Sequence, residues 1–213
     1  MKLYSLPPSP NSFKIAALAH HLGLPLEVVP VDMLNGQHQS PEYLALNPNG
    51  LMPTLQDGDF TLWESNAILI YLAQRKPESG LYPQDPKGQA LVHQWLDWYH
   101  CHWGAAFRPY LVERLFKPQF RGQPGDEQVV AQAEEPFRKV AAMLNSHLSQ
   151  RPYLLGEALT VADFAVASVL VFANAVQVPL ADYPHIRAYA DRVLKLPAFA
   201  QAIPPMGAPA GKS

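Results

Sequence analysis

One continuous stretch of the chain, residues 47–72, predicts a strand, a tight turn, a second strand and a helix start in unbroken order. The pair Asp57-Gly58 lies between Pro53–Gln56 and Asp59–Leu62, two segments in which apolar residues alternate. An Asp-Gly pair in this setting favours a two-residue hairpin turn with positive φ at both turn positions. The polar cluster Glu64-Ser65-Asn66 then precedes apolar residues at helical spacing, which predicts that a helix begins there.

The predicted helix start has a chemical use. The first backbone N–H groups of a helix have no partner within the helix and point outward with the positive end of the macrodipole. A small carboxylate or phosphate can be held by such groups. The stretch therefore predicts a small folding unit that carries an anion-binding helix end.

The first thirty residues predict a strand, a helix and a second strand. Lys2–Leu6 has a short strand pattern, which Pro7-Pro8 ends because proline cannot donate to a β-ladder. Apolar residues recur at helical spacing over Phe13–Leu22, Gly23 fits the position that closes a helix, and Leu26–Val29 predicts the second strand. This order suggests a βαβ unit, and the following hairpin and helix extend it to βαβ then ββα.

The rest of the chain predicts helices. The Pro- and Gly-rich segment 77–86 is a candidate linker, which divides the chain into an α/β domain at 1–76 and an all-helical domain at 87–213. A long helix is expected from Gly88 to about Phe116, with a kink near Ala105 caused by Pro109. Further helices are expected near 127–148, 183–196 and 198–203, with Thr160–Asp163 as a capping box and 204–213 as a loose tail.

Composition narrows the function classes. The net charge is −2 and the pI is about 6.4, and no basic face stands out, so nucleic acid and anionic membranes are not expected as partners. The single cysteine, Cys101, excludes an internal disulfide framework and a CxxC redox pair. His93 and Asp97 precede Cys101 at four-residue spacing, but no second ligand cluster supports them, and we expect no metal. No apolar run of about 18 residues occurs, which indicates a cytoplasmic protein without a membrane span.

The elements Asn-Pro-x-Gly, x-Pro-x-Leu, Asp-Gly and Glu-Ser-x-Ala-Ile within residues 47–72 resemble the glutathione-binding half of the cytosolic glutathione S-transferases. The resemblance covers almost the entire chain, densely from Lys2 to Leu72, and Thr160–Asp163 is similar to a capping motif of the family's helical domain. It implies a thioredoxin-like domain followed by a helical bundle, a homodimer, and glutathione as co-substrate without another cofactor. The similarity is to serine-type bacterial and plant phi- and theta-like members, which suggests a role in detoxification.

The resemblance also implies site residues. In the family, the proline that opens the first hairpin strand is cis, and the preceding residue pairs its backbone with the cysteinyl part of glutathione; these positions are Pro53 and Met52. Glu64 and Ser65 would hold the γ-glutamyl amine and carboxylate. A plain helix start remains the alternative for Glu64-Ser65.

A second binding segment is implied at His38-Gln39-Ser40-Pro41-Glu42, which resembles the plant-type segment whose His and Lys bind the glycine carboxylate of glutathione. Gln39 stands where the lysine is expected, so a neutral donor replaces a charge. A solvated loop histidine is the alternative for His38.

The hydroxyl of Ser9 is the expected catalytic group, because Ser9, Lys14 and Ile15 match the spacing of the serine-type enzymes. A hydroxyl there can donate to the glutathione thiolate and favour its ionised form. A free thiol with a pKa of about 8.5 is only a few per cent ionised at pH 7. Lowering that pKa by about two units takes roughly 2.7 kcal/mol, which one hydrogen bond to a charged group and a helix N-terminus can supply.

Other residues compete with Ser9, which could instead be a turn residue or a helix N-cap. Asn11 and Ser12 follow in the same loop, and Ser9-Pro10-Asn11 also resembles nu-like bacterial members that carry Thr-Pro-Asn and reduce disulfides with bound glutathione. Tyr4 is a further hydroxyl, but it lacks the motif of the tyrosine-type families and fits a strand or core residue better.

An aromatic series on the long helix, His100, Trp103, Phe107 and Tyr110, is the expected wall for a hydrophobic electrophile, although such spacing is also typical of simple core. The sequence thus favours conjugation of glutathione to a hydrophobic electrophile. Glutathione-dependent disulfide reduction and a non-catalytic binding module of the same fold remain open.

Overall fold

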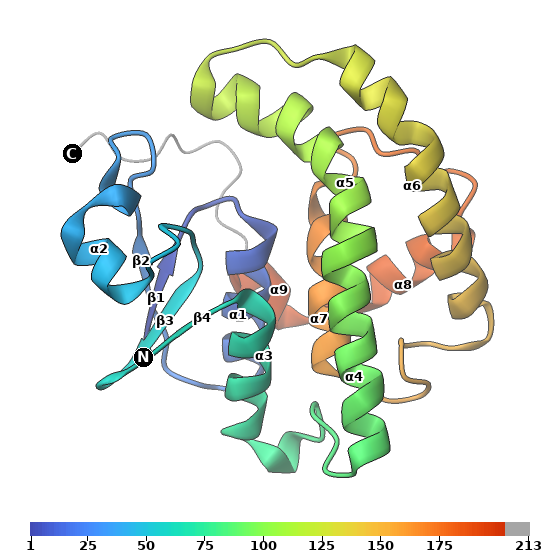
Figure 1. The fold of residues 1–213 in the computed structure, drawn as a ribbon. Helices are drawn as coiled ribbons and strands as arrows, with labels where there is room; N and C mark the ends of the chain where they lie inside the picture. The colour runs from blue at the N-terminus through green and yellow to red at the C-terminus, as the bar shows by residue number, and fades with distance from the viewer. Residues whose placement is uncertain (203–213) are drawn as a thin grey trace. The chain divides into compact units, whose positions relative to one another are not determined.

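The computed structural model describes residues 1–202, which form two compact units (Figure 1). Of the described residues, the α/β unit consists of Met1–Tyr82 together with 195–202, and the helical unit consists of Pro83–Leu194. The predicted tail at 204–213 lies outside the described residues. Within residues 1–202, no helix is both long enough and apolar enough to cross a membrane.

The α/β unit is built on a four-stranded sheet whose strand order is β2-β1-β3-β4. Its strands are β1 (Lys2–Ser5), β2 (Glu27–Pro30), β3 (Thr54–Asp57) and β4 (Phe60–Trp63). β1 and β2 pair in parallel, whereas β3 is antiparallel to both β1 and β4. The predicted βαβ-ββα order is confirmed.

Helices complete the α/β unit, and those named here are α1 (Pro10–His21), η1 (Gln37–Gln39), α2 (Pro41–Leu46), α3 (Ser65–Gln74), η2 (Pro77–Ser79) and α9 (Pro197–Ala202). α1 and α3 run side by side along the sheet (Figure 1). Apolar side chains from the sheet and these two helices form the core without exposed surface, among them Leu3, Ile15, Leu18, Leu55, Ile68 and Leu72. This core holds the amino ends of α1 and α3 in fixed positions.

The hairpin turn differs from the prediction by one residue. Asp57 pairs with Phe60, so the two turn residues are Gly58 and Asp59 rather than Asp57-Gly58. Only Gly58 of the two has a positive φ, of 64°. The turn therefore places glycine at the first central position, as in a type II′ turn, and Asp57 is left in the strand. There Asp57 accepts a 2.7 Å hydrogen bond from the Tyr71 hydroxyl of α3.

The last described helix also differs from the prediction. The sequence assigns residues 87–213 to one helical domain, but the described residues 195–202 belong to the α/β unit. The rings of Phe13 on α1 and Phe199 on α9 lie 5.5 Å apart, edge to face. The apolar side of α9 is therefore buried against α1, a pairing that local sequence patterns do not reveal.

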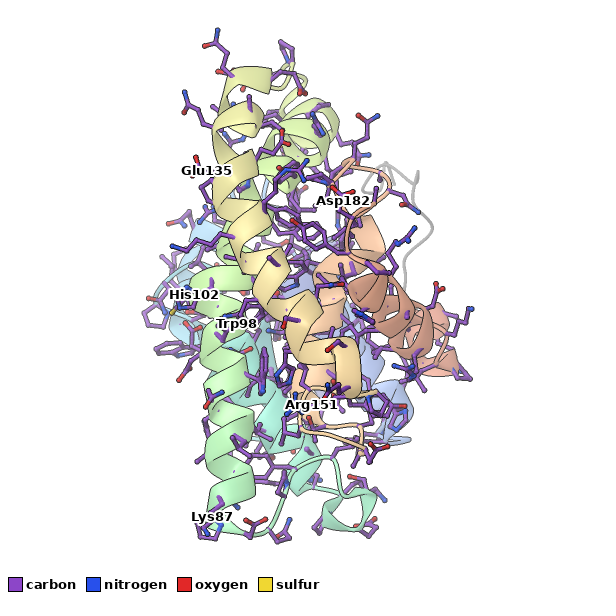
Figure 2. The ribbon with its side chains drawn as sticks, turned by 90° about the vertical axis from the view of Figure 1, so that its right-hand side faces the viewer. Lys87, Trp98, His102, Glu135, Arg151 and Asp182 are labelled. Atoms are coloured by element: carbon purple, nitrogen blue, oxygen red, sulfur yellow. The ribbon has the colours of Figure 1, made fainter. Side chains whose placement is uncertain are left out.

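The helical unit contains α4 (Pro86–Trp98), η3 (Tyr99–Trp103), α5 (Gly104–Leu111), η4 (Val112–Arg121), α6 (Glu127–His147), η5 (Leu148–Gln150), α7 (Val161–Ser168), η6 (Val169–Phe172) and α8 (Pro184–Leu194). Figure 2 faces α6, with Glu135 in its first half and Arg151 just beyond its end. The Phe107 and Tyr110 rings of α5 contact Phe137 of α6 at 5.9 and 5.6 Å. An aromatic cluster thus joins α5 to α6.

The long predicted helix changes its hydrogen-bond pattern rather than ending. Both η3 and η4 are π-helical segments, and they flank α5. Pro109 lies inside α5, so the change falls before and after the position predicted at Ala105. π-helical turns accommodate an extra residue in a continuous helix, and Pro118 lies within the second of them, η4.

α7 is the central element of the helical unit, because every one of its residues is buried. Thr160 and Asp163 form the predicted capping box. The Asp163 carboxylate also accepts from the Leu154 N–H at 2.9 Å and from the Tyr189 hydroxyl at 3.2 Å. Burial raises the pKa of Asp163 to about 6, against the opposing effect of these donors.

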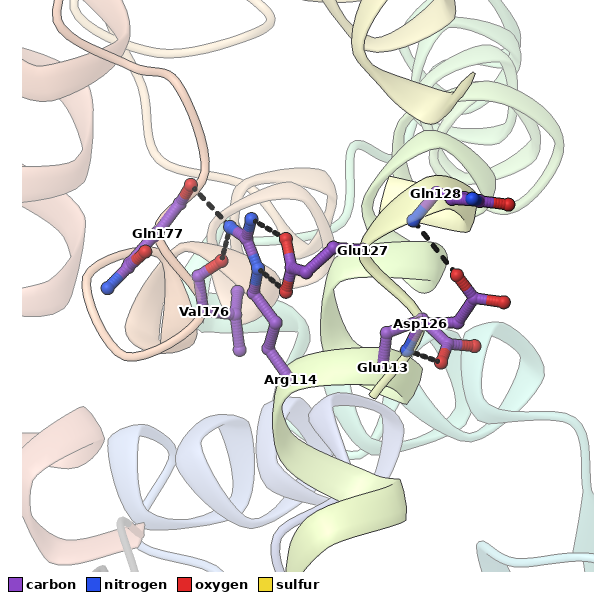
Figure 3. Close-up of polar contacts among 7 residues, drawn as sticks. All are labelled: Glu113, Arg114, Asp126, Glu127, Gln128, Val176 and Gln177. Atoms are coloured by element: carbon purple, nitrogen blue, oxygen red, sulfur yellow. Dashed lines mark hydrogen bonds and ion pairs between the residues drawn. The ribbon is translucent and has the colours of Figure 1, made fainter. Parts of the chain in front are cut away.

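One arginine ties three segments of the helical unit together (Figure 3). Arg114 forms hydrogen bonds from Nε and Nη2 to the two carboxylate oxygens of Glu127, at 3.0 and 2.5 Å. Its Nη1 donates to the backbone carbonyls of Val176 and Gln177, at 3.0 and 3.2 Å. Because a guanidinium presents its donors in a rigid fork, Arg114 fixes the start of α6 against the chain that follows η6.

Candidate functional site

Three strands of the α/β unit, β1, β3 and β4, have one terminus at the same end of the sheet, which we call the sheet edge. Tyr4 of β1 pairs with Thr54 of β3, and Thr54 pairs with Trp63 of β4, so these residues form one row. Neighbouring strands lie about 4.8 Å apart, which puts the end of β1 about 10 Å from the end of β4. The loops that follow β1 and β4 and the loop that precedes β3 therefore leave the sheet at the same edge.

Ser9 lies in the loop after β1 and is the N-cap residue of α1. Its N–H donates to the Leu6 carbonyl at 2.7 Å, and its carbonyl accepts from the Phe13 N–H at 2.9 Å. Its side chain makes no capping hydrogen bond. The backbone of Ser9 thus does the work of a cap, while its hydroxyl, on a half-buried residue, remains available to a ligand.

The competing residues of this loop have other settings. Asn11 is the second residue of α1 and takes part in a further interaction. Ser12 is buried, and its hydroxyl finds no hydrogen-bond partner among the described residues. The hydroxyl of Tyr4 donates to Gln56 at 3.3 Å, which fits the strand role expected of it. Of the three residues with a hydroxyl, Ser9 is the one that is half-buried and whose side chain makes no capping hydrogen bond at the start of α1.

Glu64 and Ser65 follow β4 and begin α3. Glu64 is the N-cap residue and has a φ of 71°, a value that a side chain with a β-carbon rarely adopts. Such a conformation costs of the order of 1–3 kcal/mol and commonly marks a functional position. Here it turns the chain so that Ser65 opens α3 at the sheet edge, where the unpaired N–H groups of the first turn can bind a carboxylate.

The Met52–Pro53 peptide bond is cis, as the resemblance implies, and it precedes β3 at the same edge. The Pro7–Pro8 bond is also cis, which the sequence did not predict. Pro53 is buried and Met52 is half-buried. The Met52 backbone therefore lies directly before β3, beside the row formed by Tyr4, Thr54 and Trp63.

A buried polar network holds the loop before Met52. Asn47 Nδ2 and the Tyr43 hydroxyl both donate to the Leu51 carbonyl at 2.8 Å. Asn47 Nδ2 also donates to the Thr54 hydroxyl at 3.1 Å, and the Tyr43 and Thr54 hydroxyls lie 3.0 Å apart. The sequence motif contained Asn47, but its burial depends on Tyr43 of α2, which no local pattern connects to it. This network fixes the backbone on both sides of the cis bond.

His38 and Gln39 form the short helix η1, which lies against the turn at Gly50. A β-carbon on Gly50 would be only 2.5 Å from Gln39 Nε2 and 3.0 Å from the His38 carbonyl. The φ of Gly50 is 60°, so glycine is favoured there for two reasons. His38 is half-buried, and its Nδ1 is buried without a hydrogen-bond partner in the described part of the chain. Gln39 is exposed.

One site feature was missed in the sequence. Lys14 has no exposed surface and donates a 2.7 Å hydrogen bond from Nζ to Asn66 Oδ1, which lies next to Ser65 in α3. Sequence spacing had matched Lys14 to the resembling family without giving it a role. A signal was present, because Lys14 interrupts the apolar run between Phe13 and Ile15 on the core side of α1.

The aromatic series of the helical unit has mostly the contacts of a core. Trp103 and Phe107 have no exposed surface, and Trp103 Nε1 donates to the Val166 carbonyl of α7 at 3.1 Å. Tyr110 is buried as well, although its hydroxyl has no partner among residues 1–202. His100 is exposed. Burial therefore favours the core interpretation for Trp103 and Phe107, which the sequence had left open.

The chemical groups at the sheet edge are the hydroxyl of Ser9 and the amino ends of two helices. α1 and α3 are long enough to carry a macrodipole, and both begin beside the row of Tyr4, Thr54 and Trp63. Such an arrangement stabilises negative charge on a ligand, including a thiolate and a carboxylate.

Two segments of the chain match models of known protein families. Residues 1–74 match the family "Glutathione S-transferase, N-terminal domain", and residues 127–192 match "Glutathione S-transferase, C-terminal domain". The chain is 34% identical over 212 residues to the "Probable glutathione S-transferase GSTF2" of Oryza sativa subsp. japonica, covering 99% of each sequence.

Solved structures agree with these matches. A glutathione S-transferase-I bound with lactoylglutathione has a TM-score of 0.87 and 33% identity, over 95% of this chain and 97% of that one. The theta class glutathione S-transferase from Xanthomonas axonopodis pv. citri, with glutathione bound, has a TM-score of 0.85 and 31% identity, over 98% of each chain. The sequence, the fold and the relatives together establish that the chain belongs to the glutathione S-transferase family.

Proposed function

We propose that the protein conjugates glutathione to a hydrophobic electrophile, with Ser9 as the donor that stabilises the glutathione thiolate. The observation that carries this proposal is the hydroxyl of Ser9, which makes no capping bond although it lies at the start of α1. One hydrogen bond from a neutral donor to a thiolate contributes about 1.5–3 kcal/mol, or roughly one to two pKa units.

The remaining groups at the sheet edge hold the tripeptide. Glu64 pairs with the γ-glutamyl amine, and Ser65 with its N–H and hydroxyl binds the γ-glutamyl carboxylate. The Met52 backbone, held by the cis bond to Pro53, pairs with the cysteinyl residue. His38 and Gln39 contact the glycine carboxylate, and Gln39 does so as a neutral donor.

The chemistry uses the two substrates and the hydroxyl of Ser9. The S–H proton of glutathione passes to solvent, and the thiolate sulfur forms a bond to the electrophilic carbon. The leaving group departs with the electron pair of its bond, or the adjacent carbon of an activated double bond takes up a proton. Ser9 keeps its own proton throughout, so it is a donor rather than a nucleophile.

The electrophile contacts the helical unit. Of the aromatic series, His100 and Tyr110 can present a polar group, whereas Trp103 and Phe107 form the core that supports them. A cytoplasmic role in detoxification fits a weakly acidic chain with one cysteine.

A homodimer is part of the proposal. β4 is an outermost strand of the sheet, and its Phe60 and Trp63 are 45% and 40% exposed. Large exposed apolar side chains on an outermost strand favour coverage by a second copy of the chain. Sedimentation equilibrium would give twice the chain mass for the parent and a larger monomer fraction for Phe60→Ser.

Two assays on purified protein test the function. Titration calorimetry with millimolar glutathione should give a saturable heat, and a chlorodinitrobenzene probe with glutathione should be conjugated above the uncatalysed rate. A small hydroxyethyl disulfide in place of the electrophile distinguishes the disulfide-reductase alternative.

The outcomes distinguish conjugation, disulfide reduction and a non-catalytic binding module. Binding with conjugation supports the proposal, and binding with disulfide reduction alone would assign the chemistry to the alternative. Saturable binding without either reaction would leave a binding module. The absence of any heat would overturn the proposed function.

A further inference from the structure

Lys14 is an ionisable side chain in the interior of the α/β unit. It has no exposed surface, and its neighbours on α1 from Phe13 to Ala19 are all buried. Burial of an ammonium group costs several kcal/mol even after a partner is found. A methionine or leucine would fill the same volume without that cost, so packing alone does not explain a lysine here.

The direction of the side chain is informative. Lys14 Nζ lies 2.7 Å from Asn66 Oδ1, and these residues are 52 positions apart in the chain. Asn66 is the second residue of α3, directly after Ser65 and two positions after Glu64. Lys14 is the fifth residue of α1. The hydrogen bond therefore joins the second turn of α1 to the first turn of α3, and both helices begin at the candidate site.

A second interaction links Lys14 to the same turn. Burial lowers the pKa of Lys14, and the negative charge of the Glu64 carboxylate opposes this by raising it. Glu64 itself holds a φ of 71°. A conformation of this kind persists only where its surroundings hold it in place.

We propose that Lys14 is a positioning residue, which through Asn66 and the charge of Glu64 holds the Glu64–Ser65 turn in the geometry that binds the γ-glutamyl part of glutathione. This inference rests on the proposed function, because it concerns the same binding site. Lys14 does not touch the ligand. It acts on groups that hold the substrate equally before and during the reaction, so its loss raises KM and leaves kcat nearly unchanged.

Four variants and one non-reactive probe test the proposal. Lys14→Met removes the charge and the donor, Lys14→Arg keeps both, and Asn66→Ala removes the acceptor. Lys2→Met is the control, because it makes the same lysine-to-methionine substitution at an exposed position of the same unit. The probe is S-methylglutathione, whose binding by calorimetry requires the γ-glutamyl contacts but no thiolate.

The expected result is a loss of about tenfold in affinity for the probe in Lys14→Met and Asn66→Ala, with partial recovery in Lys14→Arg and none of this loss in Lys2→Met. In the conjugation assay KM for glutathione should rise by a similar factor, with kcat within about twofold of the parent. The melting temperature of Lys14→Met at pH 7 should equal or exceed that of the parent, because a buried charge has been removed.

A double-mutant cycle supplies the second readout. If Lys14 acts through Asn66, the loss in the variant that combines Lys14→Met with Asn66→Ala should be well below the product of the two single losses. Unchanged probe affinity in Lys14→Met, or a lowered melting temperature with unchanged KM, would overturn the positioning role. The proposed function fails separately, namely when the parent itself binds neither glutathione nor the probe.

Discussion

Thr54 of β3 and Trp63 of β4 are paired across the hairpin, so Pro53 and Glu64 are each the next residue beyond a paired position. The same pairing that builds the sheet thus brings the cis bond before β3 beside the start of α3. Two parts of the proposed tripeptide site are consequently fixed by one antiparallel register. A register slip by one residue would separate them and turn their side chains to opposite faces.

Ser9→Ala should lower kcat for conjugation by about 10- to 100-fold, the value of one hydrogen bond to a charged group. Because the hydroxyl makes no capping bond, the melting temperature should change little. Steady-state kinetics at saturating glutathione and a thermal melt check both parts.

Ser12→Ala is the matched comparison for Ser9→Ala. The Ser12 hydroxyl is buried without a hydrogen-bond partner in the described chain, so its removal should leave turnover intact. If turnover fell in Ser12→Ala and persisted in Ser9→Ala, the thiolate donor would be Ser12.

Glu64→Ala and Glu64→Gly should both lose most affinity for glutathione, because both lack the carboxylate. They should differ in stability. Glycine accepts a φ of 71° without a steric penalty, so Glu64→Gly should be more stable than Glu64→Ala by about 1 kcal/mol or more. Urea unfolding of the two variants measures the difference, and equal midpoints would show that the turn is not strained.

Gly50→Ala should destabilise the protein by about 1–2 kcal/mol through its positive φ and should also raise KM for glutathione. The added β-carbon would meet Gln39 and the His38 carbonyl, which must then move. Gly58→Ala is the control, since Gly58 has a similar φ of 64° and open space around it. Gly58→Ala should lose a similar amount of stability and leave KM for glutathione unchanged. If KM rose equally in Gly58→Ala and Gly50→Ala, the rise would not report a specific role of Gly50 in the site.

The stability of the parent should rise with pH above 7 relative to Lys14→Met. Burial lowers the pKa of Lys14 from 10.5 to about 7 in the folded protein, so between these values the unfolded chain binds more protons than the folded one. The free energy of unfolding therefore increases with pH in this window, and the penalty of the buried charge is complete only below pH 7.

Urea unfolding of both proteins at pH 6, 8 and 10 checks the direction. The advantage of Lys14→Met over the parent should shrink by about 4 kcal/mol across this range, since one pKa unit corresponds to about 1.4 kcal/mol and nearly three units of the shift fall within it. Curves that remain parallel would show that Lys14 titrates as an exposed lysine does.

Local patterns were sufficient for the order of the elements. The alternation around Gly58, the prolines after β1 and the capping box at Thr160 each act over a few residues, and each predicted an element that the structure contains. The turn was displaced by one position, because an Asp-Gly pair fits two registers and only strand pairing selects between them.

Features that depend on distant contacts were not predictable. The packing of Phe199 against Phe13 assigns α9 to the α/β unit, and helical periodicity carries no information on which core a helix joins. Likewise, the spacing of Trp103 and Phe107 indicates a buried face, but burial among neighbours and contact with a ligand give the same pattern. Lysine is expected at the surface, so composition rules alone do not predict the burial of Lys14, although its place between Phe13 and Ile15 was a local signal of it.

The role of Ser9 is tested most sharply by the pKa of the glutathione thiol in the bound complex, which can be measured from the ultraviolet absorbance of the thiolate as pH is varied. We expect this pKa to lie about two units below the ordinary thiol value of about 8.5 in the parent, and one to two units higher than in the parent in Ser9→Ala. A bound thiol that titrates near 8.5 in the parent, or equally in both proteins, would contradict the proposed role of Ser9.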